Sequence, residues 1–118
     1  MALGSRRSRC PVACTLDVLG DKWTLLVIRD IALGKRRYSE FLDSPEGIPT
    51  NVLADRLKRL AAKGIIKGHH YSRHPPRFEY ELTVKGEELR PIMRAMFDWG
   101  IRHAGGRKSP QALPIARH

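Results

Sequence analysis

The chain has 118 residues, which is the size of one domain and argues against a multidomain enzyme. Lysine and arginine number 22 against 12 aspartates and glutamates, so the net charge is +10 and polyanions such as DNA or RNA are the expected partners. Because 42% of the residues are hydrophobic, this charge belongs to a folded domain, which excludes a disordered basic tail.

Cysteine usage and hydropathy indicate the compartment. The two cysteines, Cys10 and Cys14, have no second pair that would suggest a disulfide framework or a four-ligand zinc site, which favours a reducing cytosol. The longest apolar run, residues 25–28, is far shorter than the roughly 20 residues that span a bilayer, and no apolar segment follows the basic N-terminus. We therefore expect a cytoplasmic protein with no membrane partner.

The two ends of the chain lack an apolar repeat. Residues 1–9 are small and basic, and residues 104–118 contain two glycines and two prolines. We expect a flexible basic N-terminus over residues 1–9, one folded domain over residues 10–103, and a flexible C-terminal tail over residues 104–118.

Two helices are predicted at the start of the domain. The first spans residues 10–20, because Pro11 suits the first turn of a helix and Gly20 suits a left-handed cap. The second is capped by Asp21, repeats apolar residues at helical spacing and stops at Gly34. The apolar face of the first helix consists of Val12, Ala13, Leu16 and Leu19.

A short helix and a longer one follow. The short helix covers residues 38–42 with Ser39 as its cap. A turn rich in proline then leads to a helix over residues 50–63, which Gly64 ends. Leucines repeat along one side of this helix and polar, net basic residues along the other, so one face is core and the other is basic.

The remaining residues predict a hairpin and a last helix. Strands are expected over residues 65–71 and 78–82, with a loop over residues 72–77. Thr83 caps a helix about five turns long over residues 84–103. Its continuous apolar stripe consists of Leu89, Ile92, Met93, Met96, Phe97, Gly100 and Ile101.

Positive charge is concentrated in one stretch. Residues 56–78 contain no acid, yet they hold Arg56, Lys58, Arg59, Lys63, Lys67, Arg73 and Arg77 as well as three histidines. A helix that follows a short helix and a turn, and precedes a basic hairpin, is the winged helix-turn-helix arrangement, which lays one helix in a major groove. The expected fold is therefore mainly α with a small β-hairpin wing, plus extra N- and C-terminal helices.

Over about residues 10–100, the chain resembles the HxlR-type winged helix-turn-helix transcriptional regulators of bacteria, which are relatives of the MarR-like regulators. The matching motifs are CPVA at 10–13, LDVLGDKW at 16–23, IRD at 28–30, GKRRYSE at 34–40, GIPTNVL at 47–53, RL at 56–57, PPRFEYELT at 75–83, then Gly86, Leu89, Trp99 and Gly100. The resemblance implies a homodimer built by helices 10–20 and 84–103, a palindromic operator, and regulation of a nearby gene in response to oxidants, electrophiles or small metabolites.

The resemblance makes the helix over residues 50–63 the recognition helix. Asparagine suits adenine, lysine and arginine suit guanine, and aspartate suits cytosine, so its outward residues are expected to contact base edges. They are Thr50, Asn51, Asp55, Lys58 and Arg59. A solvated helix face is the alternative, which the absence of acids over residues 56–78 disfavours.

Other polar residues are expected to contact phosphates or to act from the wing. Those at the start of the short helix lie beside free backbone N–H groups, and those of the wing surround paired prolines. A charged hairpin that only protects a strand edge is the alternative for the wing. Arg56 lies near the apolar face and either anchors phosphate or braces the core; we assign it to phosphate. The set is Arg36, Arg37, Ser39, Arg56, Arg73, His74 and Arg77.

Cys10 is the candidate redox sensor. It lies at the expected start of the first helix beside Arg9, where the helix dipole and the cation stabilise a thiolate. The resemblance implies that redox-sensing members use the cysteine at this position, whereas Cys14 is outside the common pattern. A small residue kept for packing is the alternative for Cys10. Because the two thiols are poorly placed for a mutual disulfide, an intersubunit or mixed disulfide is the expected oxidised form.

Nothing in the sequence predicts a metal, a cofactor or catalysis. His69, His70 and His74 have no cysteine or carboxylate near them in sequence, and adjacent strand residues point to opposite faces. A Gly-rich phosphate loop is also lacking. Three aromatic residues, Trp23, Phe97 and Trp99, line either an effector pocket or a dimer interface, and we expect the interface.

The sequence therefore predicts a sequence-specific DNA-binding transcriptional regulator, not an enzyme, that acts in the nucleoid as a homodimer on a pseudo-palindromic operator. Its partners are double-stranded DNA, a second copy of the chain and an oxidant or small-molecule effector. Two alternatives stay open: a sequence-nonspecific architectural nucleic-acid-binding protein, and a protein whose primary function is electrophile chemistry at Cys10.

Overall fold

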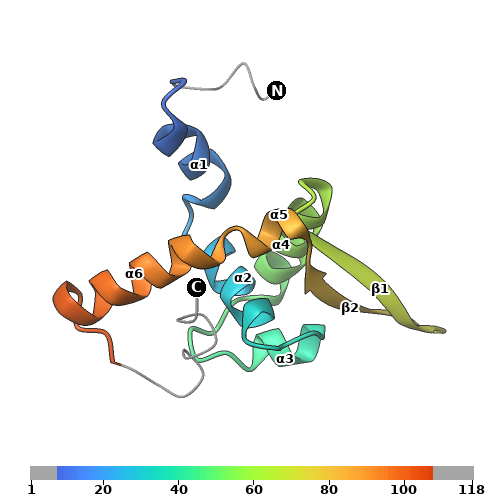
Figure 1. Ribbon diagram of the computed structural model, residues 1–118. Helices are drawn as coiled ribbons and strands as arrows, with labels where there is room; N and C mark the ends of the chain where they lie inside the picture. Colours follow the sequence, from blue (N-terminus) through green and yellow to red (C-terminus); the bar gives the residue numbers. More distant parts are fainter. Residues whose placement is uncertain (1–7, 108–118) are drawn as a thin grey trace.

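The computed structural model describes residues 8–107, which form six helices and one antiparallel hairpin (Figure 1). The predicted flexible ends fall largely on residues 1–7 and 108–118, outside the described part. In chain order the elements are α1 (Pro11–Leu19), α2 (Thr24–Ala32), α3 (Tyr38–Leu42), α4 (Thr50–Ala62), β1 (Ile66–Arg73), β2 (Pro76–Leu82), α5 (Val84–Glu87) and α6 (Arg90–His103). This mainly helical fold with a hairpin wing confirms the expected fold class.

The core lies between α2, α3, α4 and the base of the hairpin. Ile28 of α2 and Leu53 of α4 are fully buried, and Phe41 of α3 is 1% exposed. The leucines that repeat along α4 all point into this core, so the opposite side of the helix is left to solvent. Figure 1 shows the hairpin leaving the body on one side, α6 on the other, and α1 standing away from both.

The hairpin is longer than the sequence predicts. Its register runs from Ile66 opposite Leu82 to Arg73 opposite Pro76, with a bulge at Tyr71. The expected loop over residues 72–77 is therefore wrong, because pairing continues past the bulge and leaves only His74 and Pro75 at the tip. Pro76, which lies within the expected loop, instead begins β2, where its missing N–H costs nothing.

Several predicted helix ends are confirmed. Asp21 accepts hydrogen bonds from the backbone N–H groups of Trp23 and Thr24 at 2.8 and 3.0 Å, so it caps α2. Partial burial raises the pKa of Asp21, but hydrogen bonds from Thr24, Trp23 and Arg56 outweigh it and hold that pKa well below its usual range. Gly34 and Gly64 have φ of 111° and 73°, as a left-handed stop requires.

Two predicted caps are wrong. Gly20 has φ −80° and is right-handed, so α1 ends without a left-handed residue. Ser39 lies inside α3, whose start is closed by the Glu40 carboxylate; it accepts from the backbone N–H groups of Arg36 and Arg37 at 2.6 and 2.9 Å. A glutamate three residues into a helix reaches back in this way more readily than a serine in the first turn.

The last predicted helix is two helices. Thr83 caps α5 as expected, since its hydroxyl accepts from the backbone N–H of Gly86 at 3.1 Å. The chain then bends at residues 88–89, and α6 begins with Pro91 in its first turn. A single helix over residues 84–103 is therefore wrong, because the proline lacks an N–H and its ring hinders the preceding turn.

Over the described residues, none of the helices combines the length and the apolar character that crossing a membrane would require.

Candidate DNA-binding surface

The outer face of α4 carries most of the predicted base-contacting set. Thr50, Asn51, Lys58 and Arg59 are exposed, because the leucines of this helix face the core. Tyr38 of α3 joins the start of α4, where its hydroxyl donates to the carbonyl of Thr50 at 2.7 Å. Polar side chains thus stand outward on one helix face, an arrangement that suits base-edge contacts.

Asp55 and Arg56 are engaged with each other and with neighbours. The Asp55 carboxylate accepts from Arg56 at 2.5 Å and lies 3.0 Å from Nε of Arg59. Nε of Arg56 also donates to Asp21 at 3.2 Å, and the Arg56 side chain is only 16% exposed. The geometry therefore has Arg56 tying α4 to the cap of α2, which is the bracing role left open by the sequence.

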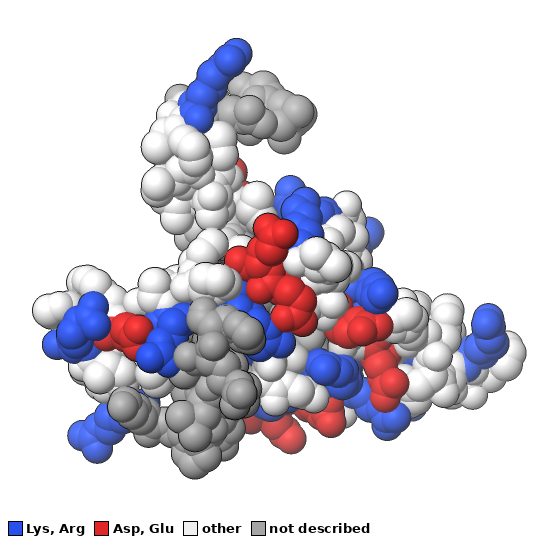
Figure 2. All heavy atoms as spheres, viewed as in Figure 1, with Lys and Arg blue, Asp and Glu red and all other residues white. Residues whose placement is uncertain are grey.

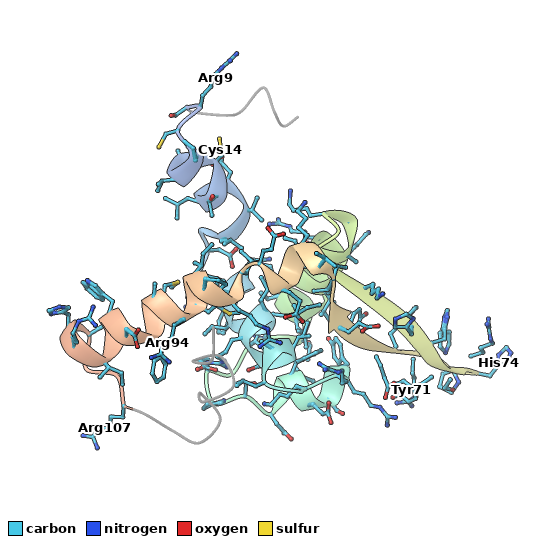
Figure 3. The ribbon with its side chains drawn as sticks, in the orientation of Figure 1. Arg9, Cys14, Tyr71, His74, Arg94 and Arg107 are labelled. Atoms are coloured by element: carbon cyan, nitrogen blue, oxygen red, sulfur yellow. The ribbon has the colours of Figure 1, made fainter. Side chains whose placement is uncertain are left out.

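The hairpin presents its basic residues around the tip. Arg73, His74 and Arg77 are all exposed, and Figure 3 places His74 at the far end of the hairpin. On the face that Figure 2 displays, basic and acidic groups are interspersed over the body, whereas the end of the hairpin has basic groups and no acidic ones. Such a tip suits a polyanion.

Acidic residues of β2 compensate charge nearer the body. Nε2 of His69 lies 2.6 Å from Glu81, and Lys67 lies 4.0 Å from the same carboxylate. His70 instead stacks on Phe78, with ring centroids 4.3 Å apart. In the part of the chain that the structure describes, no group of three or more His, Cys, Asp or Glu side chains is placed to hold a metal.

The predicted phosphate contacts at the start of α3 have partners within the protein. Nη1 of Arg36 donates to the carbonyl of Ile31 at 2.8 Å, and Arg37 donates to Glu79 at 2.9 Å. The Glu40 carboxylate also occupies backbone N–H groups at this helix end. Ser39 remains exposed beside a cleft of about 380 Å³ between α3 and the hairpin.

This cleft contains aromatic residues that the sequence analysis did not assign to the functional site. Tyr38, Tyr71, Phe78 and Tyr80 line it together with both prolines of the wing. Figure 3 shows Tyr71 projecting from the hairpin on the side of α3. Alternation along β2 places Phe78 and Tyr80 on one face of the hairpin, whereas no local pattern signals the bulge at Tyr71.

The N-terminal thiols differ in environment. Cys10 is exposed, and backbone N–H groups of Ala13 and Val12 lower the pKa of its thiol. Cys14 is half-buried, and its Sγ donates to the carbonyl of Ser8 at 3.5 Å. Figure 3 labels Cys14 on α1, the helix that stands away from the body.

The three aromatic residues expected at an interface have different surroundings. Trp23 packs against the core and lines a small cavity with Val27 and Ile48. Phe97 lines a cleft of about 650 Å³ between α2, the loop before α4 and α6, alongside Leu25, Met93 and Met96. Trp99 lies outside this cleft, 57% exposed and 5.2 Å from the ring of His103.

Comparison with known proteins agrees with this geometry. The HxlR-like helix-turn-helix family matches residues 18–108, which include α4 and the whole hairpin. The chain belongs to this family. It is accordingly a DNA-binding transcriptional regulator and not an enzyme, and DNA is its partner.

Individual regulators that are similar to this chain match most of its length. The HTH-type transcriptional regulator sll1512 of Synechocystis sp. is 41% identical over 91 residues, which cover 77% of this chain and 67% of the relative. The redox regulator HypR, solved in its reduced form, has a TM-score of 0.73 and 37% identity, covering 80% of this chain and 94% of that chain. Reduced YodB from B. subtilis has a TM-score of 0.67 and 26% identity, covering 86% of this chain and 100% of the YodB chain.

Proposed function

We propose that this HxlR-like protein regulates transcription as a homodimer that binds a pseudo-palindromic operator in the nucleoid, with one α4 in each half-site. The observation that carries the proposal is the exposed polar face of α4 together with a hairpin whose tip is basic, on a fold that buries the other face of that helix. Half-sites in such complexes lie about one helical turn apart, or slightly more.

Base contacts are proposed for the outward residues of α4, namely Thr50, Asn51, Asp55, Lys58 and Arg59. The Asp55 carboxylate is already engaged by the guanidinium groups of Arg56 and Arg59, so the amino group of a cytosine would have to share this carboxylate with them. Phosphate contacts are proposed for Arg73, His74 and Arg77 of the wing and for Ser39 and Arg36 near α3. Arg56 is proposed as a brace, since its guanidinium donates to two carboxylates of the protein.

The proposed dimer is built by α1 and α6. Val12 and Leu16 of α1 are 68% and 51% exposed, although both belong to its apolar face. Ile92, Met96 and Trp99 form a second exposed apolar row along α6. Water-exposed rows of this kind on two projecting helices favour burial against a second copy of the chain.

Selection of bound duplexes from a randomised DNA pool tests the proposed function. Reduced protein at near-physiological salt should enrich an inverted repeat. An unenriched pool despite tight binding at low salt would instead establish a sequence-nonspecific architectural protein, because phosphate contacts alone carry no sequence information.

The division between base and phosphate contacts predicts different behaviour for two variants. Lys58→Ala should reduce discrimination at one base pair by roughly 1–3 kcal/mol. Arg77→Ala should weaken binding to all duplexes alike and lower the slope of log affinity against log salt by about one. Competition assays with operator and scrambled duplexes at several salt concentrations measure both, and identical behaviour of the two variants would contradict the division.

We further propose that an oxidant or electrophile acts through Cys10; the cleft beside Phe97 is the alternative site, for a small-molecule effector. HypR, which resembles this chain, is solved in both reduced and oxidised forms as a redox regulator. The exposed Cys10 thiol, whose pKa is lowered by backbone N–H groups, supports the same role here.

Alkylation by iodoacetamide should distinguish the two cysteines. A lowered pKa means that the thiolate forms at lower pH, so Cys10 should reach half its maximal rate at a lower pH than a cysteine in an unfolded peptide does. Because Cys10 is exposed and Cys14 is half-buried, Cys10 should also react faster than Cys14 at pH 7. Mass spectrometry of peptides across a pH series measures both rates, with Cys10→Ser as the control that leaves Cys14 alone. Equal rates at pH 7 would remove the basis for sensing at Cys10.

A further inference from the structure

Arg37 stands at a junction between the wing and the helix-turn-helix. Its Nε donates to Oε2 of Glu79 in β2 at 2.9 Å. The central carbon of the same guanidinium lies 3.8 Å from the centroid of the Tyr71 ring, at the bulge of β1. One side chain just before α3 thus contacts both strands of the hairpin.

The backbone reinforces this junction. Arg37 forms a β-bridge with Glu79, and the N–H of Tyr80 donates to the carbonyl of Arg36 at 2.8 Å. The next residue, Tyr38, donates its hydroxyl to the carbonyl of Thr50, where α4 begins. A continuous path of contacts therefore runs from the wing through residues 36–38 to the first residue of the recognition helix.

We propose that Arg37 is a positioning residue that fixes the wing relative to the recognition helix through Glu79 and Tyr71, and that it is not a phosphate ligand. The inference rests on the proposed operator binding, and it replaces the phosphate role expected for this residue from the sequence. Contacts of α4 in a major groove and of the wing tip beside it must be made simultaneously. A fixed angle between them lowers the ordering cost of binding.

The charge arrangement separates this role from phosphate binding. A phosphate that took Arg37 would have to displace the Glu79 carboxylate and separate the guanidinium from Tyr71. If Arg37 were a ligand, neutralising Glu79 would free it and tighten binding to DNA. If Arg37 is a positioning residue, neutralising Glu79 loosens the wing, and binding to DNA weakens even though an acid is removed.

A double-mutant cycle on the selected operator tests the two roles. We expect Glu79→Gln and Arg37→Gln each to weaken binding about 2–5-fold, the range of an exposed ion pair, and the double variant to be little weaker than either. Glu81→Gln is the matched control, because it removes an acid from the same strand without touching Arg37. It should bind no more weakly than the unaltered protein. Two results would overturn the positioning role. One is tighter operator binding by Glu79→Gln. The other is a loss of affinity on Arg37→Gln that is as large in the Glu79→Gln background as in the unaltered protein.

A measurement on the free protein separates this inference from the proposed function. The backbone N–H of Tyr80 donates a hydrogen bond to the carbonyl of Arg36. Its amide hydrogen exchange should therefore be faster in Arg37→Gln, in Glu79→Gln and in Tyr71→Leu than in Glu81→Gln. An unchanged exchange rate at Tyr80 in the first three variants would refute the positioning role of Arg37 and leave the proposed operator binding standing. Failure of the unaltered protein to select an operator would instead refute the proposed function.

Discussion

Gly86→Ala is expected to lower the free energy of unfolding by about 3 kcal/mol, at the upper end of the usual cost of overpacking. A methyl group at this position would overlap the backbone carbonyl oxygen of Ile65, and it would also lie 3.2 Å from Cδ2 of Leu82. Both neighbours belong to the base of the hairpin, where Thr83 also bonds to Ile65. Because the main obstacle is backbone, a rotamer change cannot relieve the overlap.

Thermal and urea unfolding followed by circular dichroism measure this effect. Gly100→Ala in α6 is the matched control, since nothing lies within 4 Å of the added methyl group there. It should raise stability by roughly 0.5–1 kcal/mol, because alanine favours a helix over glycine. Equal stability of the two alanine variants would contradict the close approach of α5 to Ile65.

Trp99→Glu is expected to convert the proposed dimer to a monomer and to weaken binding to the inverted repeat by about 100-fold or more. The loss arises because two linked half-site contacts become independent ones, whereas affinity for a single half-site stays nearly unchanged. Trp99 is 57% exposed and lies outside the core, so the fold should persist with an unaltered circular dichroism spectrum.

Sedimentation velocity together with binding to full and half operators measures this prediction. Arg102→Glu provides a matched control, because it changes the charge of α6 by more than Trp99→Glu does and starts from a polar residue that is also exposed. It should remain a dimer. A dimeric Trp99→Glu protein would move the subunit interface away from this face of α6.

Local patterns determined much of this protein in advance. Leucines at helical spacing defined the buried side of α4 and hence its outer face, because side-chain direction follows helix geometry. Asp21, Gly34 and Gly64 marked helix ends correctly, since capping acts over only a few residues. Pro91 carried the signal for the break before α6 as well, but the continuous apolar stripe concealed it.

The tertiary structure alone decided which charged side chains remain available to DNA. Arg37 and Glu79 are 42 residues apart, and Arg56 and Asp21 are 35 apart, so no local pattern pairs them. The sequence determined that positive charge is dense between residues 56 and 78. Folding brought acids from other segments to some of these cations and left the wing tip uncompensated, because charge pairing depends on distance in space and not along the chain.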